Sequence, residues 1–95
     1  MRTEIIHKVP NGKLLRIGIE FDTTVIHSIQ INGDFFAHPE DIIQRFESAL
    51  LHLPVESNPE KVTHLLDHIV AEKNARIIGF DTKTLAELIC TAVNP

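Results

Sequence analysis

His64 and His68 have the spacing in this chain that most resembles a metal-binding pattern. They stand four residues apart in His-Leu-Leu-Asp-His. On a helix this spacing places two imidazoles on one face, as zinc sites require. The position directly after the first histidine, where a zinc protease carries its glutamate, holds Leu65. Val62 and Leu66 mark a different, apolar face of the same segment. We therefore expect an exposed polar face and no metal site.

Carboxylates near the ends of the predicted strands could supply acid–base chemistry, but none forms a close pair by spacing. They are Glu4, Glu20, Asp22 and Asp34. Asp34 follows Gly33, where a carboxylate can accept hydrogen bonds from backbone N–H groups and shape a turn. The four glycines are dispersed, so no phosphate-binding loop is present. No nucleophile–base arrangement has a recognisable local context. The sequence predicts no catalytic residue in this chain.

The composition is that of an ordinary globular domain. Ninety-five residues predict one domain spanning 1–95, with 43% hydrophobic and 23% charged residues. The net charge is −4 and the basic residues are scattered, which argues against a nucleic-acid partner. No apolar run is long enough to span a membrane, and the N-terminus lacks a signal peptide's apolar core, so we expect a cytoplasmic protein. The single Cys90 excludes an internal disulfide and falls in an apolar helical pattern, which predicts a buried thiol.

The first third of the chain predicts three strands in an antiparallel meander. Apolar and polar residues alternate from Leu15 to Phe21 and again from Val25 to Ile31, which places His27 on the inward face. A weaker strand candidate spans Glu4 to Val9. Asn11-Gly12 supplies the positive φ angles of a tight hairpin turn.

The remainder predicts about three helices. The first begins at Pro39-Glu40-Asp41, and the second is capped by Ser57 or Asn58 and ends near Lys73. Asp81 caps the third. Between the last two, Ala75 to Phe80 fits a brief strand or a buried connector, and we favour the connector. The sequence therefore predicts a two-layer α+β fold, with a three-stranded sheet packed on the helices.

Gly33-Asp34-Phe35-Phe36 places two of the chain's five phenylalanines side by side after the third predicted strand. Adjacent side chains in a turn point in different directions. We therefore expect one ring to enter the core and the other to lie against something else. An exposed aromatic ring is a common anchor of protein interfaces. Gly33, Asp34, Phe35 and Phe36 are our candidate partner interface.

Residues 25–36 resemble the C-terminal accessory domain of lipoate–protein ligases. In that family a strand of alternating hydrophobic and polar residues follows a Gly-Lys hairpin and leads into Gly-Asp-Phe-Phe. A proline and acidic residues then begin a helix, here at Pro39-Glu40-Asp41. Ile77-Ile78-Gly79-Phe80-Asp81 is similar to the family's closing segment. The resemblance covers about residues 12 to 92.

The resemblance implies that this chain is the small, non-catalytic subunit of a split ligase, because the nucleotide loop and catalytic lysine of the family's large domain have no counterpart here. A separate large subunit would bind lipoate, ATP and Mg, and this chain alone would bind no cofactor. The family's accessory domain is needed to form lipoyl-adenylate and moves aside for transfer to a lipoyl-acceptor domain. The implied fold is a small α/β layer similar to sulfur-transfer and iron–sulfur scaffold domains.

Two other functions stay open on the sequence. One is an adaptor for cofactor or sulfur trafficking with no role in adenylation, although an iron–sulfur scaffold would need more cysteines than Cys90. The other is a small enzyme or metal protein using His64 and His68, which the predicted polar face of their helix disfavours.

Overall fold

The three-stranded antiparallel sheet is the scaffold of the fold. The computed structural model describes residues 1–10 and 13–94. Strands β1 (Arg2–Val9), β2 (Lys13–Phe21) and β3 (Ile26–Gly33) lie in the order β1-β2-β3. The meander is therefore confirmed. The turn expected at Asn11-Gly12 lies outside the described residues.

Period-two alternation determines which face of this sheet is buried. Leu15, Ile17 and Ile19 on β2 are each at most 1% exposed, whereas Arg16 and Glu20 face outward. Alternate side chains of a strand point to opposite faces, so one register buries the whole apolar set. The predicted half-buried strand is confirmed.

His27 does not lie on the inward face, and that prediction was wrong. The register between β2 and β3 shifts at their connection: Glu20 pairs with Ser28, but Phe21 pairs with Ile26. His27 is thus the extra residue of a bulge. The bulge buries Ile26 and turns the imidazole outward. Simple alternation could not show this inserted residue.

A second, two-stranded sheet joins segments far apart in the chain. β4 (Phe36–His38) pairs antiparallel with β5 (Arg76–Ile78), with Phe36 opposite Ile78. The connector favoured for Ala75 to Phe80 is therefore incorrect, because its centre is a strand. Three residues carry too short a pattern to reveal a strand whose partner is distant in sequence.

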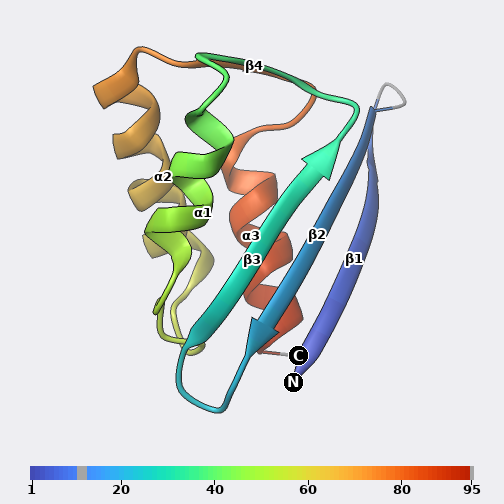
Figure 1. The fold of residues 1–95 in the computed structure, drawn as a ribbon, viewed down its shortest axis with the longest axis vertical. Helices are drawn as coiled ribbons and strands as arrows, with labels where there is room; N and C mark the ends of the chain where they lie inside the picture. Colours follow the sequence, from blue (N-terminus) through green and yellow to red (C-terminus); the bar gives the residue numbers. More distant parts are fainter. Residues whose placement is uncertain (11–12, 95) are drawn as a thin grey trace.

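The helices lie on one side of the larger sheet (Figure 1). They are α1 (Ile42–Leu50), α2 (Pro59–Lys73) and α3 (Thr82–Val93). α3 contacts β1 and β2, α1 contacts β3, and α2 packs on the other two helices. The two-layer α+β fold predicted from the sequence is confirmed. In Figure 1 the N-terminus and the end of α3 lie at one end of the molecule, and β4 lies at the opposite end.

Helix α1 begins later than its proline predicts. β4 keeps the chain extended as far as His38, and the N–H of Ile42 then donates to the carbonyl of Pro39 (3.0 Å) in a turn. Asp41 occupies the N-cap position without a side-chain capping hydrogen bond. Glu40 and Asp41 therefore precede the helix instead of forming its first turn.

The other two helix starts follow their capping residues. The Asn58 side chain accepts a hydrogen bond from the N–H of Lys61 (2.8 Å), which resolves the choice between Ser57 and Asn58. The Asp81 carboxylate accepts one from the N–H of Thr84 (2.7 Å). These bonds satisfy backbone donors that have no partner within the helix.

The core lies between the sheet and the helices. Its largest fully buried side chains include Phe46, Leu66 and Leu85, one from each helix. Cys90 is 7% exposed, which confirms the predicted buried thiol, and burial raises its pKa. A thiol with a raised pKa forms the reactive thiolate less readily, so Cys90 is a packing residue here.

Candidate partner interface

The two histidines with metal-binding spacing lie on the exposed face of α2, as the sequence predicts. His68 Nε2 lies 3.7 Å from Glu72 Oε2, one helical turn further on. Within residues 1–10 and 13–94, no three His, Cys, Asp or Glu side chains are grouped so that they could hold a metal ion. His64 instead borders an open groove between α2 and α3, which also carries Asp67, Lys83 and Glu87. Its mixed charges fit a solvated surface.

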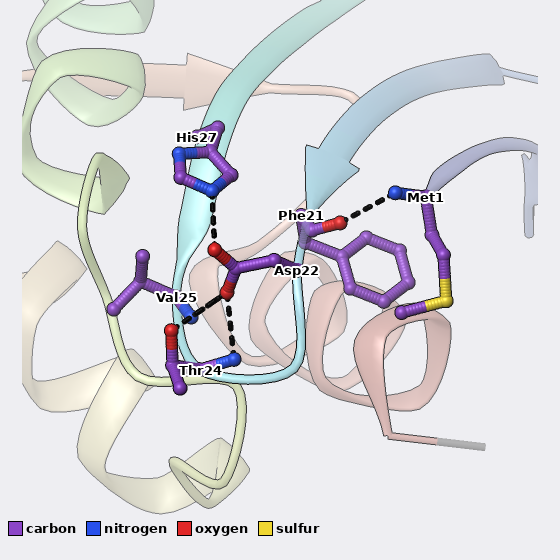
Figure 2. Close-up of polar contacts among 6 residues, drawn as sticks. All are labelled: Met1, Phe21, Asp22, Thr24, Val25 and His27. Atoms are coloured by element: carbon purple, nitrogen blue, oxygen red, sulfur yellow. Dashed lines mark hydrogen bonds and ion pairs between the residues drawn. The ribbon is translucent and has the colours of Figure 1, made fainter.

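Asp22 organises the turn between β2 and β3 (Figure 2). Its carboxylate accepts hydrogen bonds from the hydroxyl and N–H of Thr24 (both 2.7 Å), from the N–H of Val25 (2.9 Å) and from His27 Nε2 (2.6 Å). The Thr24 hydroxyl, the backbone donors and His27 together hold the pKa of Asp22 well below its usual range. This carboxylate has its acceptor positions filled by the turn itself. Its role is to hold the turn.

Gly33 ends β3 at a place where no other residue fits. Its φ is 155°, and a Cβ built there would overlap the carbonyl oxygen of Leu14. The N–H of Asp34 donates to that same oxygen (2.9 Å). The carboxylate of Asp34, which we expected to bond a backbone N–H, is hydrogen-bonded to none of the described residues. Asp34 therefore supports the turn through its backbone.

Phe35 is the ring that turns inward. It is half-buried and meets the buried ring of Phe80 edge to face, with centroids 5.0 Å apart and an interplanar angle of 83°. Gly79 allows this approach, because a Cβ there would lie 2.9 Å from Phe35 Cβ. Phe35 thus links the end of β3 to the segment that leads into α3.

Phe36 is the ring that turns outward, and 72% of it is exposed. As the first residue of β4 it points to the face opposite the side chain of Ala37, which is half-buried. Its cross-strand neighbour Ile78 is 59% exposed. Ile78 is not among the interface residues predicted from the sequence. No local signal links it to Phe36, since their pairing depends on the fold.

These features define an α+β domain with an exposed apolar pair on a two-stranded ribbon. In the described part of the chain, no helix is long and apolar enough to cross a membrane.

No protein-family model and no curated protein matches this chain. A chain in a solved structure does match its fold. That structure describes an archaeal lipoylation system, a bi-partite lipoate protein ligase and its E2 lipoyl domain, from Thermoplasma acidophilum. The similarity has a TM-score of 0.77 and 25% sequence identity, and it covers 94% of each chain. This chain therefore has a fold that occurs in a lipoylation system.

Proposed function

We propose that this chain is the non-catalytic accessory subunit of a two-component lipoate–protein ligase. The observation that carries the proposal is the likeness to a chain of the archaeal bi-partite ligase system over 94% of both chains. The Gly33-Asp34-Phe35-Phe36 segment adds support from the sequence. The partner would be a large subunit that binds lipoate, ATP and Mg, and lipoyl-acceptor domains would be met only through that subunit.

The proposed role follows from the needs of adenylation. The lipoate carboxylate attacks the α-phosphorus of ATP, pyrophosphate leaves, and a mixed anhydride forms. Both reactants are anionic, and water would hydrolyse the product, so the site must hold them in place and exclude solvent. A domain that closes over the site achieves this without donating a catalytic group. The acceptor lysine then attacks the acyl carbon and AMP leaves.

The chemistry of this chain agrees with a supporting role. Asp22, whose pKa is shifted most clearly downward, is engaged by its own turn. Cys90 is buried with a raised pKa, which disfavours the alternative of a sulfur-carrying adaptor. A general adaptor without a role in adenylation differs from the proposed subunit in one measurable respect: it would not change the formation of lipoyl-adenylate.

The test is to mix the purified chain with the ligase large subunit of the same organism. Pyrophosphate release and lipoyl-adenylate are measured with lipoate and Mg-ATP, with and without the chain. We expect adenylate to form only when both are present. Supplying preformed lipoyl-adenylate should bypass this need, and transfer to a lipoyl domain should then proceed with the large subunit alone. Equal adenylate formation without the chain would show that the proposal is wrong.

A further inference from the structure

The outward face of the β4–β5 ribbon combines apolar and cationic side chains. We call it the ribbon face and define it by Phe36, His38, Arg76 and Ile78, which are all exposed. The cross-strand pairs are Phe36 with Ile78 and His38 with Arg76. The opposite face of the ribbon carries Ala37 and Ile77, which pack against the core.

The apolar pair differs from the other exposed apolar residues of the described chain. Met1, Ile6 and Leu51 are also exposed: Met1 precedes β1, Ile6 lies on β1 and Leu51 follows α1. Single exposed apolar residues are ordinary for a protein surface. Phe36 and Ile78 lie directly opposite each other and are 72% and 59% exposed. An aromatic and β-branched pair does stabilise a two-stranded ribbon. That local role does not require the two side chains to face solvent, where much of their apolar surface remains in contact with water.

Charged residues of both signs lie beside this pair, and the two cations among them border the ribbon directly. Arg76 belongs to the adjacent cross-strand pair, with His38 opposite. The side chain of Lys13 passes beside Gly79, the residue that follows Ile78. The carboxylates nearby in the chain are Asp34, two residues before Phe36, Glu40 and Asp41 after His38, and Asp81 after Phe80. A partner that complements this surface needs an apolar pocket for Phe36 and Ile78, with carboxylates where it meets Arg76 and Lys13.

We propose that the ribbon face is the surface that docks onto the ligase large subunit, with Phe36 and Ile78 as its apolar anchor and Arg76 and Lys13 as its charged border. This inference rests on the proposed function. It also changes the interface expected from the sequence: Gly33 and Phe35 position the ribbon from within, and the contact extends to residues of β5. The ribbon lies at the end of the molecule away from the N-terminus (Figure 1), so a label on Met1 would not obstruct it.

The main test replaces the apolar pair without removing its strand preference. The double variant Phe36→Thr, Ile78→Thr places a β-branched side chain, which favours strands, at both positions but loses the apolar surface. Ile6→Thr is the matched control, because Ile6 is 68% exposed on the other sheet. Binding to the large subunit is measured by titration calorimetry, and folding by circular dichroism. We expect the double variant to bind at least about thirtyfold more weakly, and the control to bind within about threefold of the wild type.

The charged border has its own test. Arg76→Glu should slow association with the large subunit by about tenfold at low ionic strength, and the difference should shrink as salt is added. Glu4→Arg, on the outer face of the other sheet, is a charge reversal of similar size and should leave the association rate near that of the wild type. If Arg76→Glu associates with the large subunit as fast as the wild type does, the charged border does not contribute to docking.

A measurement on the wild type keeps the test decisive if the double variant does not fold. Hydrogen exchange should show added protection at β4 and β5 when the large subunit binds. Protection confined to other elements would overturn the docking inference. Self-association of the chain through the same face, detected by sedimentation and lost in the double variant, would also overturn it.

The two proposals fail in different ways. If the wild type supports adenylate formation and the double variant binds as tightly as the wild type, the docking inference is wrong and the accessory function stands. If the wild type neither binds the large subunit nor supports adenylate formation, the accessory function itself is wrong.

Discussion

The ring of Phe35 meets the ring of Phe80 edge to face at a centroid distance of 5.0 Å, while the next residue, Phe36, is 72% exposed. Two adjacent residues of one type therefore have opposite environments. Phe35 connects the end of β3 to the segment before α3. Phe36 leaves the core and forms part of the ribbon face.

This contrast predicts different stability effects for the same substitution. Phe35→Ala removes an aromatic pair and leaves a cavity, so we expect the free energy of unfolding to fall by about 2–4 kcal/mol. Phe36→Ala removes an exposed cross-strand contact and should cost less than about 1 kcal/mol. Urea unfolding of both variants measures the difference. Equal losses would mean that the two rings share one environment.

Gly79 is predicted to tolerate no side chain. Its φ is 121°, and a Cβ would lie 2.9 Å from Phe35 Cβ. We expect Gly79→Ala to lower the free energy of unfolding by about 1–3 kcal/mol. Gly18→Ala is the control, because a Cβ at Gly18 would have its nearest contact at 3.6 Å, with Arg2. Thermal unfolding should separate the two variants, and a Gly79→Ala protein as stable as Gly18→Ala would contradict the geometry.

Asp22 should make the stability of the fold depend on acid pH. Its hydrogen bonds lower its pKa in the folded state, so the folded chain binds fewer protons than the unfolded chain in acid. The stabilisation is complete above about pH 5 and is lost as pH falls through about 3.9, the usual aspartate value, toward the lowered pKa. Asp22→Asn should therefore lose less stability than the wild type between about pH 5 and pH 3.

The control for that experiment is Asp41→Asn. Asp41 makes no side-chain capping hydrogen bond at the start of α1. Urea unfolding midpoints are measured at about pH 5 and pH 3. Between these values the midpoint of Asp41→Asn should fall as much as that of the wild type, and the midpoint of Asp22→Asn should fall less. The same dependence in all three proteins would show that Asp22 contributes nothing to acid stability.

Cys90 should report on unfolding. It is 7% exposed, and burial raises its pKa. Thiol reagents should label the native protein slower than the urea-unfolded chain by about two orders of magnitude or more, because labelling requires opening of the core. Labelling kinetics followed by mass spectrometry measure this ratio. Comparable rates in the two states would place the thiol at the surface.

Regular patterns predicted most of the fold. Alternation at Leu15, Ile17 and Ile19 identified the central strand and its buried face. Capping residues located two helix starts, at Asn58 and Asp81. These predictions succeeded because each depends on residues within one or two turns of the chain.

Predictions that depended on distant partners were less successful. The inward placement of His27 failed because a bulge shifts the pairing of β3 with β2. The start of α1 moved to Ile42 because β4 keeps the chain extended as far as His38 and a turn from Pro39 follows. Neither the bulge nor the short strand leaves a recognisable pattern in the adjacent sequence.

The paired phenylalanines show what the local sequence alone could not predict. Their order in the chain already required two neighbouring rings at the end of the third strand to point in different directions. It did not specify which ring is buried, because that depends on the contact of Phe35 with Phe80 and on the pairing of β4 with β5. Phe80 and Ile78 follow two helices later in the chain, and only folding brings them to this point. The apolar surface of Phe36 and Ile78 is therefore a property of long-range packing.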